Sequence, residues 1–213
     1  MRLSELSERS GVKTATIKYY LREGLLPPGR RVSATQAEYD ESHLRRLRLV
    51  RALLQVGRLP VATAREVLEH ADDESPGRTM RLGAALWALP HGPEPDEAAP
   101  ETVLARAEVD RLLDRLEWTT AQEIGSLSPV HRSVVASLAT LIRLGYPCEG
   151  DYLAEHARLM HQVAVRDLDM METYPTEAEQ VEQAIASAVL YEPLLAALRR
   201  LAQEEESARR FGL

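Results

Sequence analysis

Residues 11–27 decide the fold of the N-terminal part of the chain, and they read Gly11-Val12-Lys13-Thr14-Ala15-Thr16-Ile17-Lys18-Tyr19-Tyr20-Leu21-Arg22-Glu23-Gly24-Leu25-Leu26-Pro27. Ser4 is expected to cap a first short helix that ends at Gly11, and Thr14 is expected to cap the next one. Gly24 stands where a residue of left-handed conformation closes a helix. The stretch therefore predicts a helix, a tight turn and a second helix.

The residues that follow predict a small β wing and then more helix. Residues 30–38 are polar and have the composition of an exposed hairpin or loop. Asp40 is expected to cap a third helix that ends at Gly57, and residues 61–70 supply one more short helix. The apolar stripe of the third helix comprises Leu44, Leu47, Val50, Leu53 and Leu54, and its other faces are expected to carry Arg45, Arg46, Arg48 and Arg51.

The order and spacing of these residues resemble the MerR family of bacterial transcription regulators. The resemblance rests on residues 11–27 and continues through Tyr39-Asp40-Glu41-Ser42-His43-Leu44-Arg45-Arg46-Leu47 and Leu54-Gln55-Val56-Gly57, about the first third of the chain. It implies a winged helix-turn-helix that binds promoter DNA as a homodimer on a palindromic operator. By the same resemblance, the protein would reshape the operator so that RNA polymerase engages it.

The second helix offers hydroxyl and ammonium groups to a major groove and its flanking phosphates. The resemblance implies that Thr16, Lys18 and Tyr19 face DNA and that Arg30 and Arg31 of the wing grip phosphates. An alternative is that the tyrosines are core residues and the arginines a solvated face. The full expected DNA-binding set is Lys13, Thr14, Thr16, Lys18, Tyr19, Tyr20, Arg30, Arg31 and Tyr39.

Two positions depart from the family pattern. Lys18 stands where many relatives have arginine, and Thr35-Gln36-Ala37 stand where many have Gly-Tyr-Arg in the wing. The wing tip therefore lacks one arginine contact to phosphate. Either the wing binds more weakly, or Arg30 and Arg31 take over its role.

The charge of the chain is divided along its length. The net charge is −7, but residues 1–72 carry 13 Lys and Arg against 9 Asp and Glu, while residues 73–213 carry 13 against 24. A basic N-terminal part on an acidic body is consistent with DNA binding by the N-terminal part alone. The start of the chain lacks a signal peptide, no membrane span is evident, and a cytoplasmic location is expected.

The fold class expected is mainly α, with a winged helix-turn-helix and a C-terminal all-helical domain. The expected divisions are a DNA-binding domain at 1–72, dimerisation helices at 73–122 with a Pro-rich linker at 90–100, and an effector or partner-binding domain at 123–213. Thr176 and Glu179 form a capping box before the last helical run, which Pro193 is expected to kink or interrupt.

The dimer contact is expected in the helix of residues 77–89, in that of residues 101–118, or in both. Trp87 is a suitable buried anchor for such a contact, and a contact within one chain is an equal alternative. A single long dimer helix cannot pass through the prolines of residues 90–100.

An effector pocket is expected between the C-terminal helices, although packing and surface roles are the alternative for its residues. No cofactor and no metal site are expected, because Cys148 is the only cysteine and His156 and His161 are badly spaced for one ion. The expected pocket residues are Trp118, His131, Tyr146, Tyr152, His156, Met160, Tyr174 and Tyr191, with His161 as a further candidate.

Two other functions remain open for the C-terminal part. Asp151, Glu155 and His156 lie close together on one expected helix, but the chain has no nucleophile elbow, P-loop, dinucleotide motif or zinc-ligand pattern, so an enzyme is not expected. The stronger alternative is an architectural or partner-binding protein that uses its acidic helices to contact other proteins and has no small-molecule effector.

Overall fold

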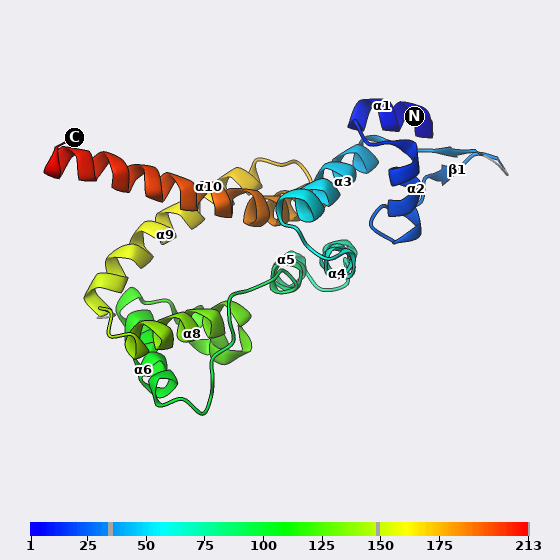
Figure 1. Cartoon of the computed structure of the whole chain (residues 1–213). Helices are drawn as coiled ribbons and strands as arrows, with labels where there is room; N and C mark the ends of the chain where they lie inside the picture. Colours follow the sequence, from blue (N-terminus) through cyan, green and yellow to red (C-terminus); the bar gives the residue numbers. More distant parts are fainter. Residues whose placement is uncertain (34–35, 148–149, 213) are drawn as a thin grey trace. The chain divides into compact units, whose positions relative to one another are not determined.

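The structure, a computed structural model, describes residues 1–33, 36–147 and 150–212, without the side chain of Asp151. Figure 1 shows a chain built almost entirely from helices, with one small sheet near the N-terminus. The chain divides into two compact units. The first unit comprises residues 1–88 and 171–213, and the second unit comprises residues 89–170.

The first unit begins with the expected helix, turn and helix. Helix α1 spans Leu3–Ser10 and helix α2 spans Thr14–Arg22. Gly11 adopts the left-handed conformation, with φ of 66°, and the Ser7 hydroxyl donates to the Val12 carbonyl at 2.7 Å, so the turn between the helices is fixed at both ends. Leu6 and Ile17 are fully buried between them.

Two short strands form the wing, as the sequence predicts. Strand β1, Arg30–Arg31, pairs antiparallel with strand β2, Ala37–Glu38, so that Arg30 lies opposite Glu38. Beyond the wing, the backbone of Tyr39 is tied to the chain start, because its N–H donates to the Met1 carbonyl at 2.8 Å. This bond holds the base of the wing against α1.

Helix α3, Glu41–Arg51, has the predicted N-cap. The Asp40 carboxylate accepts hydrogen bonds from the backbone of Ser42 and His43, and the His43 ring in turn faces the Asp40 backbone N–H at 3.2 Å. The helix continues as a π-helical segment, η1 (Ala52–Val56), and ends at Gly57 as expected.

Helices α4 (Val61–Asp72), α5 (Arg78–Trp87) and the first half of α10 (Glu177–Phe211) complete the first unit. Val181, Ile185 and Val189 of α10 are buried. Gly57 lets α10 approach closely, since a Cβ at this position would lie 2.7 Å from the Val189 side chain. The last helix of the chain therefore belongs to the same core as the helix-turn-helix.

Three local expectations were wrong. Arg2 and Lys13, not Ser4 and Thr14, occupy the N-cap positions of α1 and α2, and neither makes a side-chain cap. Arg46 does not lie on a solvated face of α3: it is 7% exposed and forms ion pairs described below. A buried guanidinium is tolerated only when it is paired, and its partners lie far away in the sequence.

The second unit is helical throughout its described residues. Its core lies between α6 and α8 and contains Ala105, Val109, Leu113, Val135, Leu138 and Ala139. Pro100 occupies the first turn of α6, and Ser128 caps α8 through the His131 N–H. The helices of this unit are α6 (Pro100–Leu116), α7 (Thr119–Ile124), the 3-10 turn η2 (Gly125–Leu127), α8 (Pro129–Arg143) and α9 (Gly150–Glu172), which belongs to the second unit as far as Met170.

Helix α10 runs through Pro193 without interruption, so the expected break there does not occur. The predicted cap is present, since the Glu179 N–H donates to the Thr176 hydroxyl at 3.3 Å. By length and composition alone, α10 is also apolar enough to cross a membrane, the one such helix among the described residues. Of its most apolar window, 11% is buried inside the protein.

The two compact units differ from the three segments expected from the sequence. Residues 73–88 and 171–213 join the helix-turn-helix in the first unit, and residues 89–170 stand as a unit between them. The proline-containing stretch 89–99 opens the second unit without helix, as expected, but the second unit ends at Met170 and does not include the end of the chain.

Candidate functional site

Helix α2 and its N-terminus present exposed polar side chains. Lys13, Thr14 and Lys18 are exposed, Thr16 is half-buried, and Tyr19 is 36% exposed. On the inner face, Ile17 is fully buried, so the core fixes which side of α2 points outward. The arrangement brings together the hydroxyl and ammonium groups that the sequence predicts for a DNA-reading helix.

Two predicted DNA-binding tyrosines lie inside the first unit. Tyr20 is 6% exposed and burial raises the pKa of its hydroxyl, while Tyr39 is buried and meets the His43 ring edge-on, with ring centroids 5.1 Å apart. Most of each ring therefore packs against protein. A DNA contact by their hydroxyl groups stays a prediction.

The wing carries the two predicted arginines on its exposed strand. The Arg30 guanidinium donates to the Glu38 carboxylate across the two-stranded ladder, and the Arg30 side chain is largely solvent-exposed while that of Glu38 is about half exposed. Arg31 lies next to Arg30 and is exposed. Thr35 lies outside the described residues, so the departure from the family pattern at the wing tip is known from the sequence only.

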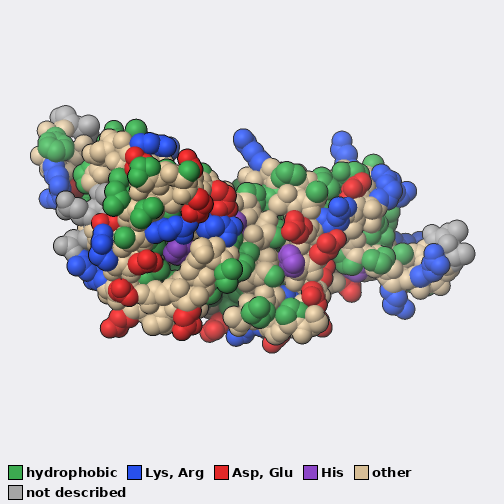
Figure 2. Space-filling model, turned by 90° about the horizontal axis from the view of Figure 1, so that it is seen from below, with side chains coloured by type: hydrophobic (Ala, Val, Ile, Leu, Met, Phe, Trp, Pro, Cys, Tyr) green, Lys and Arg blue, Asp and Glu red, His purple; other side chains and the backbone are tan. Residues whose placement is uncertain are grey.

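Basic side chains surround the wing end of the first unit. Figure 2 shows Lys and Arg side chains gathered around the wing at the right of the view, whereas acidic side chains are interspersed with basic ones elsewhere on this face. A concentration of cations near an exposed helix attracts phosphate and raises the rate of encounter with DNA.

Helix α3 is joined to α4 and α10 by a network of ion pairs that sequence reasoning did not find. Arg46 Nε lies 3.2 Å from Glu182, and its Nη2 donates to Asp72. Arg45 Nη1 lies 3.2 Å from Glu179. Arg46 and Glu182 lie 136 residues apart, so no short stretch of sequence indicates that they pair. Only an arginine on the apolar face of a predicted helix could have suggested such an ion pair.

The electrostatics of Glu182 are governed by its burial. Loss of water raises the pKa of its carboxyl even though the guanidinium groups of Arg46 and Arg45 pull it the other way. The ion pairs of the Glu182 carboxylate thus offset the free-energy cost of removing it from water. Loss of one member of the network would leave another buried charge without its partner.

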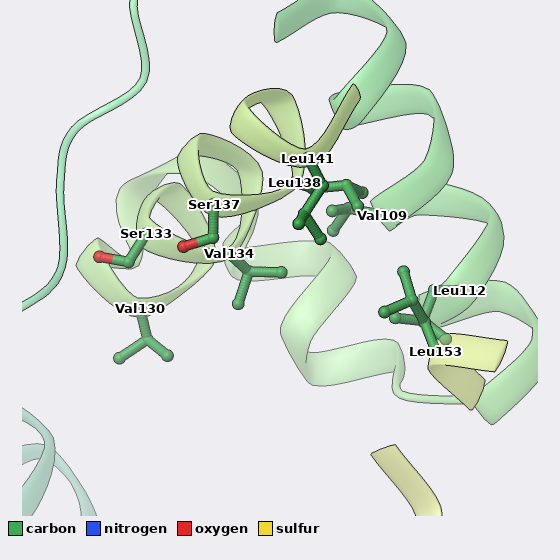
Figure 3. Close-up of a pocket in the computed structure, with 9 residues that line it drawn as sticks. All are labelled: Val109, Leu112, Val130, Ser133, Val134, Ser137, Leu138, Leu141 and Leu153. Atoms are coloured by element: carbon green, nitrogen blue, oxygen red, sulfur yellow. The ribbon is translucent and has the colours of Figure 1, made fainter. Parts of the chain in front are cut away.

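The second unit contains an apolar pocket of about 320 Å³, shown in Figure 3. Val109 and Leu138 at its floor are buried, whereas Val130 and Val134 at its edge are exposed. In the figure, Ser133 and Ser137 extend from α8 away from the leucines of the pocket. The lining is Val109, Leu112, Val130, Ser133, Val134, Ser137, Leu138, Leu141 and Leu153, none of which the sequence analysis had selected.

A second pocket of the same unit, about 340 Å³, lies between the end of α6 and α9. It contains two of the aromatic candidates, since the Trp118 and His161 rings lie 6.0 Å apart. Its lining is Arg115, Leu116, Glu117, Trp118, Arg158, His161 and Gln162.

The remaining pocket candidates are dispersed. Tyr152 and His156 contact one another on α9, with ring centroids 4.5 Å apart, and His131 is half-buried with a pKa lowered by desolvation. Tyr146 and Met160 are more than half exposed. Tyr174 and Tyr191 belong to the first unit. Their role in effector binding stays a prediction.

Among the described residues, no group of three or more His, Cys, Asp or Glu side chains is arranged to hold a metal ion. Cys148 lies outside these residues, as does the side chain of Asp151. Glu155 of the suggested enzymatic group forms an ion pair with Arg158, and the His156 ring contacts the Tyr152 carbonyl at 2.9 Å.

Comparison with known proteins agrees with this geometry. The family model described as MerR HTH family regulatory protein matches residues 1–71. The HTH-type transcriptional regulator ZntR homolog of Haemophilus influenzae is 38% identical over 50 residues, which are 24% of this chain and 37% of that protein. The chain thus spans little more than a third of this curated relative.

A solved structure is similar over the whole length. The "putative transcriptional regulator SCO5550" of Streptomyces coelicolor A3(2) is 65% identical, with 100% of this chain and 99% of that chain covered and a TM-score of 0.87. This chain belongs to the MerR family of transcriptional regulators, and residues 1–71 are its DNA-binding helix-turn-helix domain.

Proposed function

We propose that the protein binds a palindromic promoter operator as a homodimer and that an effector bound to its helical part modulates its output. The observation that carries the proposal is α2 with its N-terminus, where Lys13, Thr14 and Lys18 are exposed while Ile17 is fully buried. A helix presented in this way fits the major groove, and the wing then meets the flanking backbone. Promoter DNA also implies a cytoplasmic location, with RNA polymerase as a partner at the promoter.

The experiment measures binding of the purified protein to fragments of its own upstream DNA across a salt series. We expect one fragment to bind selectively, with an affinity that falls as salt rises. Lys18→Ala should weaken binding to all fragments and reduce the salt slope by about one. Arg143→Ala, an exposed arginine at the end of α8, is the control and should change neither. Equal, weak binding of every fragment would contradict an operator-specific function and favour an architectural role.

The second half of α10 is the proposed dimer surface, in place of the helices of residues 77–89 and 101–118 expected from the sequence. Leu190, Leu194, Leu198 and Leu201 are exposed at a spacing of three or four residues. Leu194 lies nine residues beyond the buried Ile185, about 180° around the helix, so this stripe faces away from the core of its own unit. The half of α10 beyond Val189 has no buried residue up to Gly212, so a second copy would supply a packing partner for its leucines.

Charge favours an antiparallel pair of α10 helices. A parallel pair would set Glu204, Glu205 and Glu206 against the same residues of the partner, and like charges in register repel. An antiparallel pair centred on Leu194 instead brings Leu201 beside the smaller Ser187 of the other copy. Large residues beside small ones let two helices approach closely.

Disulfide cross-linking tests both the surface and its direction, in a Cys148→Ser background. Leu194→Cys, near the centre of the stripe, should cross-link to itself. Leu201→Cys should cross-link in mixtures with Ser187→Cys but not to itself, whereas a parallel pair would cross-link Leu201→Cys alone. Leu194→Glu should yield monomers, and the control Leu144→Glu, exposed on the second unit, should not. Dimers that persist in Leu194→Glu would place the interface elsewhere.

A further inference from the structure

The pocket at the end of α6 differs in charge from the unit around it. Residues 89–170 carry seven arginines against 14 Asp and Glu. The pocket gathers Arg115 and Arg158 together with His161, and Glu117 is the one acidic residue in its lining. The two guanidinium groups in the lining of this cavity of about 340 Å³ favour a small anion, although the unit around the cavity is acidic.

An indole ring forms one wall of this pocket. Trp118 is half-buried and its ring is inclined at 43° to the His161 ring, 6.0 Å away. Indole and imidazole rings favour stacked or edge-on contact with planar aromatic groups. The pocket therefore combines a flat apolar wall with donors for an anion, and Gln162 adds an amide beside them.

The turn that presents Trp118 has an unusual backbone. Glu117 has φ of 56°, in the left-handed region, where glycine is the usual residue at the end of a helix. The Trp118 N–H donates to the Leu113 carbonyl at 3.1 Å and fixes the turn. A side chain at this position costs about 1 kcal/mol relative to glycine, and strain of this kind is concentrated at binding sites.

Arg158 is held at the pocket by a single neighbour on the same helix. Its guanidinium donates to the Glu155 carboxylate three residues earlier, and the side chain remains 49% exposed. A guanidinium has five N–H donors, so this pair leaves others for a ligand. The Glu155 carboxylate thus competes with any anion for the Arg158 guanidinium. Removing this carboxylate should therefore strengthen binding of an anion in the pocket.

We propose that this pocket binds a small aromatic carboxylate. The carboxylate would pair with Arg158 and Arg115, for which the planar guanidinium is well suited, and the ring would stack on Trp118. The inference rests on the proposed regulator function in one respect, namely that this ligand is the effector. Binding itself requires neither DNA nor a dimer.

The test is calorimetric titration of the full-length protein with trans-cinnamate. Cinnamyl alcohol, which has the same ring without the charge, and acetate, which has the charge without the ring, are the matched controls. We expect saturable binding of cinnamate and at least tenfold weaker binding of both controls. Trp87→Phe leaves Trp118 as the only indole, so the ligand should also change the fluorescence of that variant.

Three variants identify the pocket. Arg158→Gln should weaken cinnamate binding at least tenfold, since a charge-assisted hydrogen bond is lost. Glu155→Gln should strengthen it, because the competing carboxylate is removed, and a protein that merely unfolds cannot show this gain. Arg166→Gln, an exposed arginine on the same helix, should leave the affinity unchanged.

The outcomes separate this inference from the proposed function. Equal binding of cinnamyl alcohol, or no binding of cinnamate while operator binding is intact, would overturn the pocket assignment alone. Cinnamate binding that inorganic phosphate displaces at equal concentration would also overturn it, since the site would then recognise any oxyanion. Normal cinnamate binding by a protein without operator selectivity would instead remove the regulator function.

Discussion

At the scale of single residues, the wing holds an internal competitor for DNA. Arg30 is paired with Glu38 across the ladder, so its charge is partly satisfied before phosphate arrives. Glu38→Gln removes this competitor, and we expect tighter operator binding and a salt slope steeper by about one. Binding assays across a salt series measure both effects. Arg30→Gln should change affinity and slope in the opposite direction, and no response to either variant would exclude the wing from the interface.

Asp40 makes a second residue-scale prediction, on stability. Hydrogen bonds from Ser42 and His43 hold the pKa of its carboxyl well below the usual range. A lowered pKa in the folded protein means that the cap stabilises above about pH 4 and is lost as the pH falls through the folded value. Asp40→Ala should lower the free energy of unfolding of the first unit by about 1 kcal/mol at neutral pH.

The matched variant for this cap is Asp40→Asn, because asparagine also caps helices but does not titrate. We expect it to keep most of the stability at neutral pH and to lose less of it in acid than the natural protein. Urea unfolding at several pH values compares the three proteins. Identical acid sensitivity of the natural protein and Asp40→Asn would assign that sensitivity to other carboxyl groups.

At the scale of elements, the ion pairs between α3 and α10 should behave as one unit. Glu182→Ala leaves the buried Arg46 with Asp72 as its remaining partner in the network, and we expect a loss of about 3 kcal/mol in the free energy of unfolding. Arg46→Met with Glu182→Leu removes both charges and should recover most of it. Denaturant unfolding of the single and double variants measures the coupling, and additive losses would mean that the two residues act independently.

The elements that the sequence predicts best are those whose signals are local. Gly11 and Gly24 punctuate α1 and α2, Asp40 caps α3, and Thr176 caps α10, all within a few residues of the helix they define. The place of α10 in the core could not be predicted in this way. Its buried stripe meets η1 and α5 across more than 100 residues, and apolar spacing alone does not state which partner a helix will meet.

The candidate site residues also differ in whether the sequence carries a local signal for them. The exposed face of α2 follows from the spacing of Ile17 and its neighbours, so the residues proposed to read DNA could be chosen from the sequence. The pockets of the second unit could not, because they depend on which helices pack together. Trp118 was selected for its ring, but Arg115 and Arg158 carry no mark that separates them from other surface arginines.

At the scale of the whole molecule, the chain leaves the first unit after α5 and returns to it in α9 and α10. The second unit is thus an insertion between two parts of one core. The chain passes from the first unit to the second at residue 89, just after α5, and returns at Met171, near the end of α9. Within the first unit, α10 is tied to α3 through the ion pair of Arg46 with Glu182.

The return of α10 gives the last prediction. Residues 1–88 alone contain the whole helix-turn-helix but lack Val181, Ile185 and Val189, which are buried in the first unit. Each such side chain contributes about 1.5–3 kcal/mol, so their sum is comparable to the stability of a typical domain. We expect residues 1–88 to unfold at much lower denaturant than a fusion that joins residues 1–88 to residues 171–213 by a flexible linker. Circular dichroism during urea unfolding compares the two, with Ile185→Asp in the fusion as control. A fragment as stable as the fusion would show that α10 rests on a domain that is already complete, and its buried stripe would then need another explanation.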